Sequence, residues 1–130
     1  MKPTLYIVIP CYNEEKVLPI TAPLFLEQLK TMQIKELISS ASKIMFVNDG
    51  SKDKTWEIIN NLYNQKSHFK GLNLASNVGH QNAIMAGMMT AKDKCDAIIT
   101  MDVDLQDDIN AIEKMIDYYS NWDEADSLPL

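Results

Sequence analysis

The 130-residue sequence lacks the features that mark several large classes of protein. It has no run of about 18 consecutive apolar residues, which a membrane-spanning helix needs, so any membrane contact is expected to be peripheral. Its lysines are dispersed and its net charge is -6, which argues against binding to nucleic acid or to anionic lipid. The two cysteines, Cys11 and Cys95, are far apart and form no metal-type pair, so free thiols in a reducing compartment are expected.

The composition indicates one globular domain. Hydrophobic residues make up 46% of the chain, and a chain of this length can bury one sizeable core but not two. The first apolar stretch, Leu5–Ile9, is cut by Pro10 well before it reaches the length of a signal-peptide core. We therefore expect one cytoplasmic domain over residues 1–122, followed by an acidic, proline-broken and frayed tail over residues 123–130.

Short apolar runs alternate with stretches of helical spacing. The runs are rich in Ile, Leu and Val and are typical of strands buried on both faces; they are Leu5–Ile9, Lys43–Val47, Gly71–Ala75 and Ala97–Met101. Helical spacing is found over Trp56–Tyr63, Ile84–Ala91 and Ile109–Tyr119. Because Pro19 and Pro23 interrupt the segment after the first run, its helix is expected only near Leu24–Gln33. This order favours a parallel, doubly wound α/β sheet that holds ligands outside the carboxyl ends of its strands.

The junction after the fourth apolar run is rich in carboxylates. Asp102, Asp104 and Gln106 follow this buried run, and in an extended segment residues two apart share one face. Such oxygen ligands suit Mg²⁺ or Mn²⁺, which take one or two carboxylates and complete their coordination with water and substrate phosphates. Asp107 and Asp108 are better explained as first-turn acids opposite a helix dipole. The pattern predicts a divalent-metal site for a nucleotide diphosphate, which the acidic cluster alone would repel.

Two other junctions have both a structural and a functional explanation. Asn48–Asp53 contains a tight turn at Gly50 and a helix cap at Ser51, with Asp53 as a second capping candidate. This leaves Asp49 able to accept an N–H from a nucleotide base. In Pro10–Glu15, Tyr12 either packs under the loop or lines a base and ribose pocket. Likewise, Glu14 or Glu15 either sits in the first turn of a helix, where an acid is favourable, or lines that pocket.

The junction Ser76–Gln81 opens the third helical stretch. Gly79 near a helix N-terminus permits close approach of the backbone to an anion. His80 is interpreted as a supporting or packing residue. The chain has only two histidines, and no arrangement of His, Cys or Ser suggests a nucleophilic triad.

Taken in order, the four junctions resemble the family 2 glycosyltransferases of the GT-A fold. The matching segments are Val8–Glu15, Val47–Thr55, Asn77–Ala83 and Met101–Asp107. Gly79–Gln81 and Asp104–Asp107 are most similar to the polyprenyl-phosphate branch, the relatives of dolichyl-phosphate mannose synthase and of bactoprenol glucosyltransferases. The resemblance implies a Rossmann-like three-layer sandwich with a mostly parallel sheet, incomplete at its C-terminus in this chain.

The resemblance also implies an activity and roles for the site residues. Members of this branch transfer a sugar from a nucleotide-diphosphate donor, such as a UDP- or GDP-sugar, to a lipid phosphate at the cytoplasmic face of the membrane, with inversion. By position, Asp102, Asp104 and Gln106 would hold Mg²⁺ or Mn²⁺, with Asp104 as the catalytic residue. The residues that would contact the nucleotide are Pro10, Tyr12, Glu14, Asp49 and Asp102. An acceptor phosphate is already anionic near neutral pH and needs orientation more than a general base.

Two other functions fit the same junctions. One is a nucleotide-binding module without catalysis; the other is a glycosyltransferase with a saccharide acceptor, which would need a general base that these residues do not offer. Relatives in the resembled family continue well past residue 122, through an acceptor-binding half that pairs with the edge of the sheet. We therefore expect this chain to be a partial form that is inactive, marginally stable or self-associating as a homo-oligomer.

Overall fold

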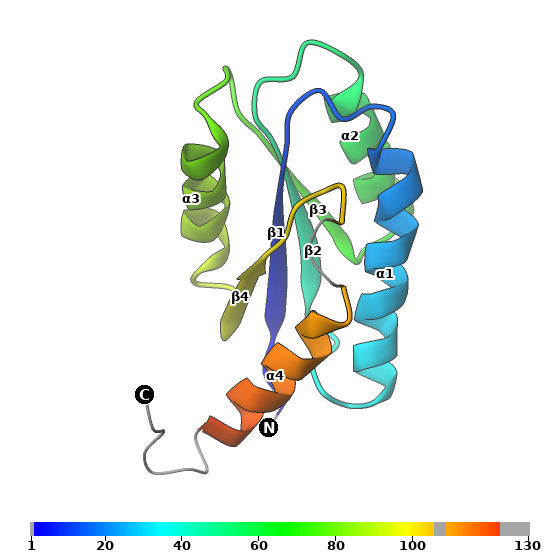
Figure 1. The fold of residues 1–130 in the computed structure, drawn as a ribbon, viewed down its shortest axis with the longest axis vertical. Coiled ribbons are helices and arrows are strands. Elements are labelled where there is room, and N and C mark those ends of the chain that lie inside the picture. The colour runs from blue at the N-terminus through cyan, green and yellow to red at the C-terminus, as the bar shows by residue number, and fades with distance from the viewer. Residues whose placement is uncertain (1, 106–108, 123–130) are drawn as a thin grey trace.

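The computed structural model describes residues 2–105 and 109–122, in which strands and helices alternate along the chain (Figure 1). The strands are β1 (Leu5–Cys11), β2 (Lys43–Asn48), β3 (Phe69–Asn73) and β4 (Ala97–Thr100). The helices are α1 (Leu18–Ile34), α2 (Thr55–Gln65), α3 (His80–Ala91) and α4 (Ala111–Trp122). All strand pairs are parallel, in the order β3-β2-β1-β4. The predicted α/β fold with a parallel sheet is confirmed.

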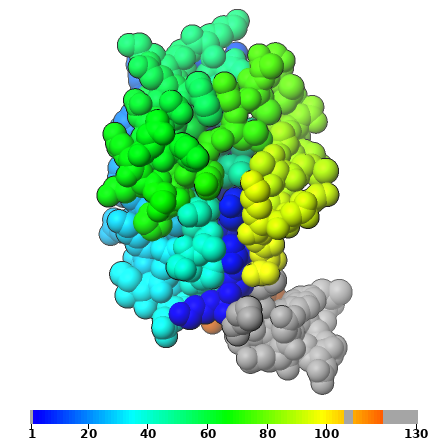
Figure 2. Space-filling view, turned by 180° about the vertical axis from the view of Figure 1, so that it is seen from behind, coloured from blue at the N-terminus to red at the C-terminus, as the bar shows by residue number. Residues whose placement is uncertain are grey.

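Helices cover both faces of the sheet (Figure 1). Alternate side chains of a strand point to opposite faces, and in β1 Ile7 and Ile9 join the core with α1, while Tyr6 and Val8 join the core with α3. The helix α4 packs with the α1 side, where Ile112 and Ile116 are buried. Both faces of the central strands are therefore apolar, which explains why their sequences show no polar alternation. In the space-filling view from behind, β1 is visible in blue between β2 and β4 (Figure 2).

The helix α1 is longer than the sequence predicts. It begins at Leu18 rather than near Leu24 and contains both prolines. Pro19 lies in the first turn, where no intrahelical partner for its N–H is required. Pro23 lies in the helix interior and costs one hydrogen bond, but it is exposed, so the carbonyl that it leaves unpaired can be hydrated. Burial of the opposite face of α1, including Phe25 and Leu29, offsets this cost.

The strand β1 passes through Pro10 and ends at Cys11, two residues later than predicted. Backbone groups of successive strand residues point to opposite edges: the Cys11 carbonyl accepts the N–H of Asp49, and the Val8 carbonyl accepts the N–H of Met101. The backbone nitrogen and carbonyl of Pro10 therefore point toward β4, like the backbone groups of Val8. The last pair between β1 and β4 is Val8 with Thr100, so the N–H that proline lacks would lie beyond the ladder.

The other strands differ in detail from the prediction. The strand β3 begins two residues early, at Phe69, because this ring is buried against Phe46. The strand β4 ends at Thr100, and both it and β3 are only partly buried. Within the described ranges, none of the helices is long and apolar enough to cross a lipid bilayer.

Candidate functional site

A cavity of about 460 Å³ opens at the carboxyl ends of β1, β2 and β4. The helices α1 and α2, which follow β1 and β2, cover one face of the sheet, and α3, which follows β3, covers the other. This reversal leaves a crevice between β1 and β4. The cavity size lies within the range of about 300–1,000 Å³ found for small-molecule sites. Its lining residues are Pro10, Cys11, Tyr12, Glu14, Asp49, Asn77, Gly79, His80, Asp102, Val103 and Asp104. The structure thus brings every described residue with a predicted metal- or nucleotide-binding role to one cavity.

The loop after β1 is fixed to the loop after β2. The Asn13 N–H donates to Ser51 Oγ at 2.9 Å, and Asn13 Oδ1 accepts the N–H of Lys52 at 2.8 Å. The Glu14 N–H donates to Thr55 Oγ1 at 2.8 Å. Sequence reasoning missed this bracing and assigned Ser51 wrongly to a helix cap. The N–H near the start of α2 is instead bound by Asp53, whose Oδ1 accepts from Thr55 at 2.9 Å.

Asp49 holds the loop that leads into α3. It is 3% exposed, its Oδ1 accepts the N–H of Val78 at 2.8 Å, and its Oδ2 accepts from the Asn77 amide at 3.3 Å. The expectation that Asp49 is left over for a ligand is therefore only partly right, because its carboxylate already has two protein donors. The adjacent Gly50 has φ +64°, and a Cβ there would lie 2.3 Å from the backbone nitrogen of Asn77. This close contact explains the glycine.

Asp102 and Asp104 reach the cavity by a different geometry from the predicted one. The expected extended segment is absent, because a turn follows β4: the Leu105 N–H donates to the Asp102 carbonyl at 3.1 Å, and Leu105 has φ +59°. Both carboxylates nevertheless line the cavity. The third predicted ligand, Gln106, lies outside the described residues. Among those described, no group of three or more His, Cys, Asp or Glu side chains could hold a metal ion.

The acids of the cavity influence one another. The pKa of Glu14 is raised above its ordinary value of 4.5, first by burial and then by the negative charges of Asp104 and Asp53. These interactions link the loop after β1 to the turn after β4 electrostatically. A cavity that already disfavours its own carboxylate charges is a favourable place for a cation.

The remaining predicted residues form the wall that β1 supplies. Pro10 is buried, whereas Tyr12 is 41% exposed and lines the cavity rather than packing under its loop. Cys11 lies between them in the chain, and its pKa is raised by burial and by the charge of Glu14, so the thiol stays protonated. Both cysteines are free thiols, as predicted.

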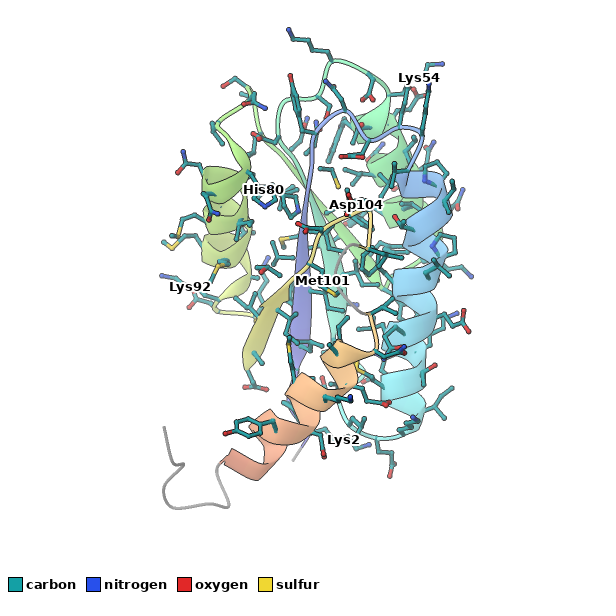
Figure 3. The ribbon with its side chains drawn as sticks, in the orientation of Figure 1. Lys2, Lys54, His80, Lys92, Met101 and Asp104 are labelled. Atoms are coloured by element: carbon teal, nitrogen blue, oxygen red, sulfur yellow. The ribbon has the colours of Figure 1, made fainter. Side chains whose placement is uncertain are left out.

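His80 lies in the cavity although the sequence suggested only a supporting or packing role. It is the first residue of α3 and projects from the start of that helix toward the sheet (Figure 3). Its Nε2 atom lies 3.9 Å from Oδ1 of Asp102. No local sequence signal places these residues together. Their proximity follows from the parallel topology, which brings the start of α3 beside the end of β4.

Solved structures of glycosyltransferases share this fold. The mannosyltransferase PcManGT from Pyrobaculum calidifontis, in complex with GDP-Man and Mn²⁺, matches with a TM-score of 0.61 at 14% identity, over 80% of this chain and 28% of that one. Residues 1–349 of S. aureus TarS, in complex with UDP-GlcNAc, match with a TM-score of 0.61 at 17% identity, over 98% and 37% of the two chains. The predicted GT-A fold is thereby confirmed.

Protein relatives are more similar in sequence. An uncharacterized glycosyltransferase of Bacillus subtilis (strain 168), YkoT, is 44% identical over 119 residues, which are 91% of this chain and 35% of that protein. A prophage bactoprenol glucosyl transferase homolog of Escherichia coli (strain K12) is 40% identical over 111 residues, or 85% and 34%. The chain thus spans about a third of the length of these curated relatives.

A family model confirms the relationship that the four junctions predict. The model for glycosyl transferase family 2 matches residues 6–127, and so includes all four strand-to-helix junctions. The chain therefore belongs to glycosyl transferase family 2.

Proposed function

We propose that this chain forms the donor-binding part of a glycosyltransferase that transfers a sugar from a nucleoside-diphosphate sugar to a polyprenyl phosphate. The observation that carries the proposal is the convergence of Asp102 and Asp104 with Tyr12, Glu14 and Asp49 on one cavity. In this assignment, Pro10, Tyr12, Glu14, Asp49 and Asp102 contact the nucleotide. The solved relatives with GDP-Man or UDP-GlcNAc bound support a nucleoside-diphosphate sugar as the ligand.

The donor set of the cavity fits Mg²⁺ or Mn²⁺. These ions need only one or two carboxylates from protein, with water and phosphate oxygens in the remaining positions, and Asp102 and Asp104 supply two in the same cavity. We assign Asp102, Asp104 and Gln106 as the metal ligands, with Asp104 as the catalytic residue. A bound divalent cation would act as a Lewis acid on the departing nucleoside diphosphate.

The acceptor is proposed from chemistry and from the relatives. A phosphate acceptor is anionic near neutral pH and attacks without a general base, provided that it is oriented. This fits a cavity in which each described carboxylate has another role. Asp49 holds a loop, Asp102 and Asp104 are assigned to the metal, and Glu14 is assigned to the nucleotide. Direct attack from the face opposite the leaving group gives inversion. The bactoprenol glucosyl transferase relatives support a lipid acceptor.

Calorimetry tests donor binding. We expect UDP or GDP to bind this chain in the presence of Mn²⁺ or Mg²⁺ and to lose affinity by about tenfold or more in EDTA, because the acidic cavity then repels the phosphates. Asp104→Asn should reduce the metal-dependent affinity to a similar extent. Asp93→Asn serves as the matched control, since Asp93 is exposed near the end of α3 and does not line the cavity.

Two results would contradict the assignment. Affinity that is the same with and without metal would exclude the metal site, and unchanged metal-dependent affinity in Asp104→Asn would exclude Asp104 as a ligand. Turnover is measured separately, as release of nucleoside diphosphate from a UDP- or GDP-sugar with polyprenyl phosphate in detergent micelles. Turnover only with an oligosaccharide would refute the lipid acceptor.

A further inference from the structure

We infer that His80 is a phosphate-binding residue of this site and donates a hydrogen bond from its imidazole to the diphosphate of the donor. This inference rests on the proposed function and adds a residue to it. Among the described lining residues, His80 has the only side chain that can carry a positive charge. The same lining contains the carboxylates of Glu14, Asp49, Asp102 and Asp104.

The charge balance of the cavity creates the need for such a donor. A divalent cation compensates the two carboxylates that bind it, but the phosphate oxygens also need N–H or O–H donors when they leave water. Asp49 cannot help, because a carboxylate only accepts hydrogen bonds and this one already receives them from Val78 and Asn77. His80 is positioned to supply a donor.

The position of His80 places that donor beside the assigned metal ligand. Nε2 lies 3.9 Å from Oδ1 of Asp102, a separation that leaves the imidazole close to the carboxylate without a tight hydrogen bond. The His80 side chain is 56% exposed, and it projects from the start of α3 toward the sheet (Figure 3). A phosphate oxygen bound to a cation at Asp102 would therefore lie within reach of the imidazole.

The backbone around His80 is open to a ligand. Gly79 has φ +94°, and a Cβ built on it would meet no atom within 4 Å. The glycine is therefore explained by its backbone conformation and not by crowding from the protein. The N-cap residue of α3 is Gly79, which has no side chain to accept the first N–H groups of the helix. Helix N-termini with uncapped N–H groups favour phosphate.

A different role for His80 must be separated from this one. The imidazole could act only through Asp102, by orienting that carboxylate for the metal. The two roles differ in a double-mutant cycle. A direct phosphate contact persists when Asp102 is replaced by Asn, whereas an effect transmitted through the carboxylate disappears.

The experiment compares His80→Leu with the matched variant Gln81→Leu, which changes the next residue of α3, exposed and outside the cavity lining. Affinities for UDP and GDP, and for uridine and guanosine, are measured by NMR titration with saturating Mg²⁺ and no Mn²⁺. We expect His80→Leu to weaken binding of the diphosphate by about tenfold or more, as for loss of a charge-assisted hydrogen bond. Nucleoside affinity should stay within about twofold, and Gln81→Leu should change neither.

The outcomes are distinct. In the Asp102→Asn background, measured with the same saturating Mg²⁺, His80→Leu should cause a similar fold loss of diphosphate affinity; if the loss vanishes, His80 acts through Asp102 and the inference is wrong. An equal loss for nucleoside and diphosphate would also overturn it, because it would indicate a general structural effect. If the unmodified chain binds neither UDP nor GDP, the proposed function fails, and this inference with it. If it binds and His80→Leu binds equally well, only the role of His80 fails.

Discussion

Replacing Gly50 with alanine should strongly destabilise the fold, because it combines two costs that can be separated. The added Cβ would lie 2.3 Å from the backbone nitrogen of Asn77 and 2.4 Å from the carbonyl carbon of Ser76, so a backbone segment must move. Overpacking of this kind costs about 1–3 kcal/mol. A non-glycine residue at φ +64° adds about 1–2 kcal/mol of backbone strain. The expected loss in the free energy of unfolding is about 2–5 kcal/mol.

A pair of variants elsewhere isolates the strain. Glu36 has φ +61° and is exposed, so Glu36→Ala and Glu36→Gly differ only by a Cβ at nearly the same backbone conformation. The free energy of unfolding is measured by urea denaturation followed by circular dichroism. The loss in Gly50→Ala should exceed the difference between the Glu36 pair by at least about 1 kcal/mol. A loss no larger than that difference would show that the loop at Ser76 and Asn77 does not press on Gly50.

Two further predictions concern stability. Glu14→Gln should stabilise the chain near neutral pH. Burial, and then the charges of Asp104 and Asp53, raise the pKa of Glu14 in the folded state, so folding disfavours its ionised form. The parent chain therefore loses stability as pH rises through that pKa. The gain over the parent should shrink to nothing below the ordinary value of 4.5, and a gain that grows on acidification would contradict this reasoning. Pro23→Ala should raise the free energy of unfolding by about 2 kcal/mol, since a restored helix hydrogen bond outweighs the greater freedom of the unfolded chain; thermal melts that show no gain would refute this.

The parallel sheet could be predicted from the sequence because a strand that is buried on both faces is apolar at every position. Runs such as Leu5–Ile9 are apolar at every position, and the helices between them keep a spacing of three to four residues. The site followed from the same pattern, because parallel strands bring their carboxyl ends to one edge. Tyr12, Asp49 and Asp104 therefore lie together although they are far apart in the chain.

The parts that could not be predicted depend on contacts between distant segments. Whether Pro23 ends a helix depends on whether its side of the helix faces solvent, and this is decided by packing. The hydrogen bonds of Asn13 with the loop at Ser51 need the two loops to be adjacent first. The turn after β4 was missed because leucine is not a residue that usually adopts a positive φ, yet Leu105 does so.

Pro10 limits how far the sheet can close. An ordinary residue at this position would present an N–H toward β4, and a slight shift of the chain after Thr100 could then extend the pairing of the two strands by another step. Proline removes that option permanently, because it has no hydrogen to donate. The covalent structure of one residue therefore prevents β1 and β4 from extending their hydrogen bonding by this step at the cavity.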